Sequence, residues 1–97
     1  MIEYDFGIPK NLDSDEVTSL LDRLFIERGL AVTLRSTLKS YPDSVHWHLK
    51  KPSSPGTLEV TWWPSKQRLW AKVSLGRDAP WIAEAIAELE RCLASKS

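Results

Sequence analysis

The chain has 97 residues, of which 42% are hydrophobic and 27% charged, and its formal net charge is zero. This length predicts a single domain over residues 1–97, large enough to bury its own core without covalent cross-links. The balanced charge gives no support, for the chain as a whole, to a nucleic-acid or membrane partner. The only cysteine, Cys92, excludes an intramolecular disulfide and a cysteine-based zinc cluster.

The charge is unevenly distributed along the chain. Residues 1–28 hold three basic and seven acidic side chains, residues 29–77 eight and two, and residues 78–97 two and four. This uneven distribution of charge either steers a charged partner to the protein or lets the charges of the sheet and of the helices neutralise each other. The N-terminus lacks a basic region followed by an apolar one, and no apolar run approaches about 20 residues. We therefore expect a cytoplasmic protein without a signal peptide or a membrane span.

The first two predicted elements are a strand and a helix. Residues 2–8 alternate apolar and acidic side chains, which is typical of a half-buried strand. A helix follows, with Asp13 and Glu16 placed as a capping box and Gly29 at its end. One face of this helix is apolar and consists of Val17, Leu20, Leu21, Leu24 and Phe25.

Four more strands and a second helix complete the chain. The turn at 41–43 separates the first two of these strands, and Gly76 ends the last. Asp78 is expected to cap the second helix, with Pro80 in its first turn. The strands are predicted at 30–38, 45–50, 57–63 and 67–75, and the helix has an apolar stripe of Trp81 or Ile82, Ala85, Ile86, Leu89 and Leu93.

The order β-α-β-β-β-β-α predicts a two-layer α+β sandwich with a mainly antiparallel sheet. Each helix has one apolar face, so both helices should pack on the same side of the sheet and leave the other side exposed. The place of strand 2–8 stays open. It can pair parallel to a neighbour after a helical crossover, or it can lie at the far edge.

The alternation of side chains assigns the tryptophans to two environments. Trp47, Trp62 and Trp81 should lie in the core, whereas Trp63 and Trp70 should lie on the exposed side of the sheet. Truncation of Trp62, but not of Trp70, should therefore prevent folding. On the exposed side the register predicts the rows Arg35–His48–Glu59–Lys72 and Thr37–His46–Thr61–Trp70, with a cation–π pair of Trp63 and Arg68 at the turn.

Basic and aromatic side chains together on an uncovered sheet predict a binding surface. The function that we expect is protein–protein association without enzymatic activity, as a homodimer, an adaptor or an inhibitor-type protein. The alternative is binding of single-stranded nucleic acid or another polyanion through the same surface. The predicted binding residues are Arg35, His46, His48, Glu59, Trp63, Arg68, Trp70 and Lys72.

The same surface also contains candidate groups for metal binding and for catalysis. The pair His46 and His48 supplies two ligands, but a zinc site needs three or four, so the sequence favours two solvated histidines and no metal or cofactor. His48 beside Glu59 has the elements of an acid–base pair. A flat sheet offers no cleft, however, and no nucleophile is evident.

Overall fold

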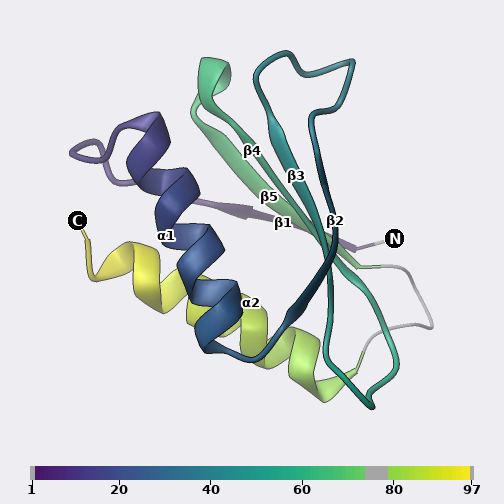
Figure 1. The fold of residues 1–97 in the computed structure, drawn as a ribbon. Coiled ribbons are helices and arrows are strands. Elements are labelled where there is room, and N and C mark those ends of the chain that lie inside the picture. The colour runs from purple at the N-terminus through teal and green to yellow at the C-terminus, as the bar shows by residue number, and fades with distance from the viewer. Residues whose placement is uncertain (1, 74–78, 97) are drawn as a thin grey trace.

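The computed structural model describes residues 2–73 and 79–96. A five-stranded sheet packs against two helices in the predicted order, so the α+β fold is confirmed (Figure 1). The elements are β1 (Ile2–Phe6), α1 (Ser14–Glu27), β2 (Ala31–Ser36), β3 (Val45–Lys50), β4 (Leu58–Trp63), the 3-10 turn η1 (Pro64–Lys66), β5 (Arg68–Val73) and α2 (Pro80–Ala94).

All neighbouring strands are antiparallel, and their order across the sheet is β1-β5-β4-β3-β2. Strands β2 to β5 form a meander, in which each strand pairs with the next along the chain. Strand β1 joins the far edge, antiparallel to β5, and this answers the question that the sequence left open. The two edges of the sheet are therefore β1 and β2, and the even number of antiparallel steps between them means that both run in the same direction.

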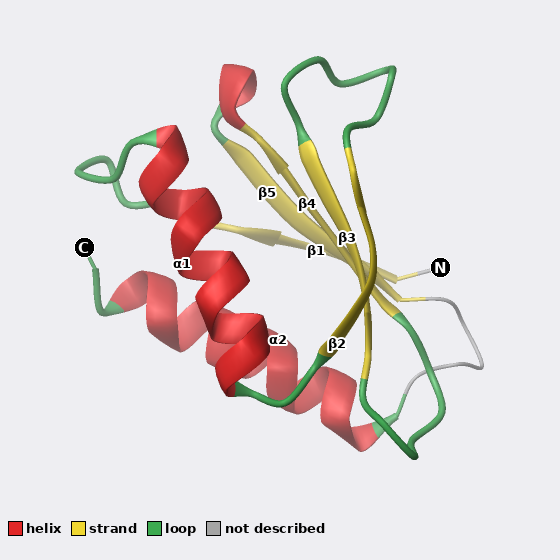
Figure 2. Ribbon diagram, in the orientation of Figure 1, coloured by secondary structure: helices red, strands yellow, loops and turns green. Residues whose placement is uncertain are grey.

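Both helices lie on one face of the sheet (Figure 2). Helix α1 begins with the predicted capping box. The Asp13 side chain accepts a hydrogen bond from the backbone N–H of Glu16, and the Glu16 side chain accepts one from the N–H of Asp13. After the helix, Gly29 adopts a left-handed conformation with φ of 71°, which suits a residue without a Cβ.

Helix α2 begins at Pro80, preceded by Ala79 in an extended conformation. Asp78 and Gly76, which the sequence analysis placed before this helix, lie outside the described residues. Within the part of the chain that the structure describes, neither helix is long and apolar enough to cross a bilayer.

The core lies between the helices and the sheet. Trp47 and Trp62 are fully buried and Trp81 nearly so, as predicted. The indole N–H of Trp81 donates to the Pro55 carbonyl at 2.8 Å, which satisfies its polar atom. The other buried hydrophobic residues of this core are Phe6, Val17, Leu20, Leu21, Phe25, Leu49, Leu58, Val60, Leu69, Ala71, Val73, Ile82, Ile86, Leu89 and Leu93.

The predicted register of β3, β4 and β5 is confirmed. Leu58, Val60 and Trp62 are buried against the helices, so the residues between them point to the opposite side, which we call the outer face. The pairs on the outer face are His46 with Thr61, His48 with Glu59, Glu59 with Lys72, Thr61 with Trp70, and Trp63 with Arg68.

The predicted register of β2 is wrong. Leu34, not Arg35, lies opposite His48, and the pairing shifts between Val32 and Leu34. The extra residue of this irregularity reverses which face each later side chain meets. Val32 remains on the helix side, opposite Leu49, whereas Leu34 lies on the outer face, where the sequence analysis had not placed it. Similarly, Ser36 rather than Thr37 lies opposite His46 in this register.

Candidate metal centre

Two histidines and a glutamate lie side by side on the outer face. His46 and His48 are separated by one residue on β3, so their side chains leave the strand on the same side. On β4, Glu59 lies opposite His48 and Thr61 lies opposite His46. Because the sheet ladder fixes both strands, these four side chains have a rigid support. We call His46, His48 and Glu59 the histidine–glutamate cluster.

The three donor atoms of this cluster have the spacing of metal ligands. Nε2 of His46 lies 3.0 Å from Nε2 of His48 and 3.5 Å from Oε1 of Glu59. Nε2 of His48 lies 3.6 Å from the same oxygen. A tetrahedral ion with ligand bonds of about 2.0–2.1 Å separates its donor atoms by about 3.3 Å. The cluster thus forms three corners of such a coordination sphere without a change of backbone.

Thr61 orients one of the two imidazoles. Its Oγ1 lies 2.7 Å from Nδ1 of His46, so the ring can donate Nδ1–H to the hydroxyl and keep a lone pair on Nε2. This is the tautomer that presents Nε2 to a metal ion. A hydrogen bond to the other ring nitrogen is the usual support of a metal-binding histidine.

Burial also favours the ligand form of His46. The residue is only 7% exposed, and its desolvation is the largest cause that lowers its pKa below the ordinary value of 6.5. His48 lowers this pKa further, Glu59 raises it, and Lys72 lowers it. An imidazole must be neutral to bind a metal ion, so a lowered pKa keeps His46 available at neutral pH.

The two tryptophans expected on the outer face are covered to different degrees. Trp70 is only 4% exposed, because the Tyr41 ring stands edge-on to it with centroids 5.3 Å apart. Tyr41 also meets the Trp63 ring at 4.8 Å, and the Trp63 indole N–H donates to the Pro42 carbonyl at 3.2 Å. Trp63 remains half-buried. The prediction that Trp70 is exposed is therefore wrong, because the connection from β2 to β3 folds over it.

The basic residues of β5 are paired with the acidic residues of β1. The Arg68 guanidinium donates to the Asp5 carboxylate at 2.9 Å, and the Lys72 ammonium lies 3.9 Å from Glu3. Arg68 lies over the ring of Trp70, 4.6 Å from its centroid. Trp70 thus takes the place of Trp63, the expected cation–π partner. The reason is that Asp5 of β1 holds the Arg68 side chain on the side away from Trp63.

Arg35 lies on the helix side of the sheet, opposite Trp47. Its guanidinium donates twice to Asp22 of α1, at 3.2 and 3.0 Å, and lies over the Trp47 ring at 5.7 Å. The Asp22 carboxylate also accepts the Trp47 indole N–H at 2.9 Å. The predicted place of Arg35 on the outer face is thus wrong, and its contacts are those of a residue that joins β2 to α1.

Two residues that shape these sites were missed from the sequence. Tyr41 is predicted from the sequence only as part of the turn at 41–43, and the large apolar area of its ring is the one signal that this turn packs on the sheet. The sequence suggested no role for Asp22. Its position, five residues after Val17 and three before Phe25, gave no sign that it accepts an indole N–H.

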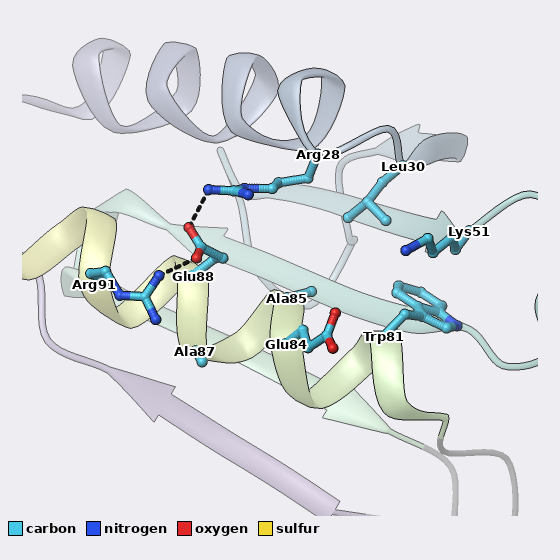
Figure 3. A pocket seen from close by; sticks show the side chains of 9 residues that line it. All are labelled: Arg28, Leu30, Lys51, Trp81, Glu84, Ala85, Ala87, Glu88 and Arg91. Atoms are coloured by element: carbon cyan, nitrogen blue, oxygen red, sulfur yellow. Dashed lines mark hydrogen bonds and ion pairs between the residues drawn. The ribbon is translucent and has the colours of Figure 1, made fainter.

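A separate hollow of about 320 Å³ lies beside α2, between the end of α1 and the residues that follow β3 (Figure 3). Charged side chains of both signs point into it, and Trp81 forms part of its wall. Glu88 accepts hydrogen bonds from Arg28, at 2.5 Å, and from Arg91. Two guanidinium groups thus share the Glu88 carboxylate. Among the described residues the histidine–glutamate cluster is the group that brings three metal-ligand atoms together, so it is the stronger candidate site.

Comparison with protein families, with curated proteins and with solved structures finds no match to this chain. The function is therefore argued from the geometry of the chain itself.

Proposed function

We propose that this domain binds a divalent transition metal ion, zinc in the first place, through His46, His48 and Glu59. The observation that carries the proposal is the spacing of Nε2, Nε2 and Oε1, which lie 3.0, 3.5 and 3.6 Å apart. Imidazole and carboxylate are ligands that zinc accepts, and other divalent ions of the first transition series share this preference.

The site has the features that raise the affinity of a three-ligand centre. His46 and His48 come from one strand and Glu59 from its hydrogen-bonded neighbour, so little conformational freedom is lost on binding. Thr61 orients the His46 imidazole by a hydrogen bond to Nδ1, the ring nitrogen that does not face the site. The carboxylate of Glu59 offsets part of the charge of the ion.

One side of the site is open. The side chains of His48 and Glu59 are 32% and 31% exposed, so a fourth ligand would approach from solvent. A zinc ion with three protein ligands keeps its fourth position for water or an exchangeable ligand. We therefore propose an accessible centre that can exchange its fourth ligand, rather than a closed structural one.

Zinc titration of the tag-free, chelator-stripped protein tests the proposal. Calorimetry, or competition with a chromophoric chelator, should give one site per chain with a Kd of about 1 μM or lower. Glu59→Gln and His48→Gln should each weaken binding at least about tenfold. Glu3→Gln is the matched control, because Glu3 is a carboxylate on the same face that lies outside the cluster.

Two results would contradict metal binding at this site. One is the absence of zinc binding at about 100 μM protein. The other is an affinity that Glu59→Gln and Glu3→Gln leave equally unchanged.

Protein association, the function expected from the sequence, remains a second candidate, but the residues that support it now lie on β2. Because Trp70 is buried, only one of the two tryptophans expected to be exposed on the outer face, Trp63, is partly accessible. Exposed Val32 and Leu34 instead favour association through β2. Binding of nucleic acid stays a prediction. Stacking of a base on Trp70 would require Tyr41 to move away.

A further inference from the structure

Strand β2 forms an exposed edge of the sheet. Its first five residues are all exposed, whereas each of the three central strands has buried residues. Val32 is 40% and Leu34 44% exposed, and they are two of the four large hydrophobic residues exposed in the described part of the chain. No other described strand pairs with the outer edge of β2. An edge of this kind offers backbone N–H and C=O groups to another strand.

The side chains of β2 do little to prevent such pairing. Its only charged residue is Arg35, and that charge is paired with Asp22. The strand contains neither lysine nor proline, which commonly protect edges. The irregularity between Val32 and Leu34 is the one feature of β2 that disfavours pairing with another strand. It disrupts the hydrogen-bond ladder locally but does not cover the edge.

The opposite edge has a different character. Strand β1 carries Glu3 and Asp5, whose carboxylates pair with Lys72 and Arg68 of β5. Pairing of β1 with β2 of another copy would be parallel, since both strands run in the same direction, and it would continue into an open chain of molecules. Pairing of β2 with β2 is antiparallel about a twofold axis and closes after two copies.

Because of the same irregularity, β2 has one exposed apolar side chain on each face of the sheet. Val32 lies on the helix side and Leu34 on the outer face. A second β2 strand would therefore find an apolar side chain on each side of the sheet. No unpaired like charges from β2 would meet, because each copy keeps its Arg35 bound to Asp22.

We infer that two copies of this chain associate through their β2 strands and form one continuous ten-stranded sheet. The contact involves one six-residue strand from each copy. It is thus at the small end of specific interfaces, and dimerisation should depend on protein concentration in the micromolar range or above. The inference is independent of the metal site, whose ligands lie on β3 and β4.

Sedimentation of two matched variants tests the inference. Val32→Lys brings one positive charge from each copy into the proposed interface, whereas Tyr4→Lys introduces a lysine at the same exposure of 40% on the β1 edge. Wild type and Tyr4→Lys should change from monomer to dimer as concentration rises, and Val32→Lys should remain monomeric. A strictly monomeric wild type at about 500 μM, or a Val32→Lys dimer of unchanged strength, would overturn the inference.

Hydrogen exchange of the wild type supplies a test that needs no variant. The outward backbone N–H groups of β2 should exchange more slowly at high protein concentration than at low concentration, and those of β1 should not change. If β1 rather than β2 becomes protected, the β2 interface is wrong. Trp63→Ala should leave the dimer intact, and its loss in that variant would assign the interface to the outer face instead.

Discussion

The ring of Tyr41 stands edge-on to the ring of Trp70, with centroids 5.3 Å apart and an angle of 67° between their planes. The two residues lie 29 positions apart, one in the connection after β2 and the other at the centre of β5. Together with Trp63 they form a small second cluster of aromatic side chains on the face opposite the helices. Tryptophans are therefore shielded on both faces of the sheet, Trp47 and Trp62 in the core under the helices and Trp70 by Tyr41.

Trp70→Ala should destabilise the fold. Truncation of a buried tryptophan lowers the free energy of unfolding by about 3–5 kcal/mol, and this one would also leave the Tyr41 ring without its contact. Urea denaturation of the variant measures the change. Trp63→Ala, at a half-buried position, should cost less. Equal losses in both variants would show that Trp70 is not the centre of the outer cluster.

Asp22→Ala should cost more stability than Arg35→Ala. The first change removes the acceptor of the fully buried Trp47 indole N–H, and an unsatisfied buried donor costs about 1–3 kcal/mol. The second breaks an ion pair with about half-exposed partners, which is worth about 0–1 kcal/mol. Thermal unfolding measures both, and Asp22→Asn should recover part of the loss because it keeps an acceptor oxygen.

The stability of the metal-free protein should fall on acidification below about pH 6.5, the ordinary pKa of histidine. The pKa of His46 is lower in the folded than in the unfolded state, so the unfolded chain binds more protons between these two pKa values. The contribution of His46 is therefore complete above the unfolded pKa and is lost as the pH falls through the folded one.

Unfolding in urea with a chelator, at several pH values, measures this dependence. His46→Gln should remove it. His48→Gln should reduce it only in part, since burial is the main cause of the shift. The same pH dependence in wild type and His46→Gln would mean that other groups produce it.

Thr61→Val should weaken zinc binding about 10–100-fold by removing the hydroxyl that orients His46. Thr61→Ser restores the hydroxyl and should recover most of the affinity. Competition with a chelator measures both. If the valine variant binds zinc as tightly as wild type, Thr61 does not support the site.

The sequence predicts the central sheet well because side-chain direction in a strand depends only on parity. Leu58, Val60 and Trp62 determine the inner face of β4, and short turns then fix the pairs of β3 and β5. The pairing of His48 with Glu59, on which the proposed metal site depends, was predicted in this way. How closely the donor atoms of both histidines approach Glu59 depends on side-chain torsions, which parity does not determine.

The remaining errors also have physical causes. Nothing in the sequence around Thr33 indicates that the pairing of β2 with β3 shifts there. The one extra residue reverses the faces that simple alternation predicts for Leu34 and Arg35. The burial of Trp70 depends on a residue from a distant connection, Tyr41. A pattern of alternation describes each strand alone and carries no information about a contact of this range.

The position of β1 has a consequence for how the chain folds. Asp5 and Arg68, which join β1 to β5, are 63 residues apart, whereas β2 to β5 pair with their neighbours along the chain. Contacts between distant residues close large loops and form late. The meander should thus fold first, and β1 should be the last strand to join it. During synthesis β1 leaves the ribosome before β5 is made, so β1 has no partner at first, and the edge of β5 stays unpaired until β1 joins it.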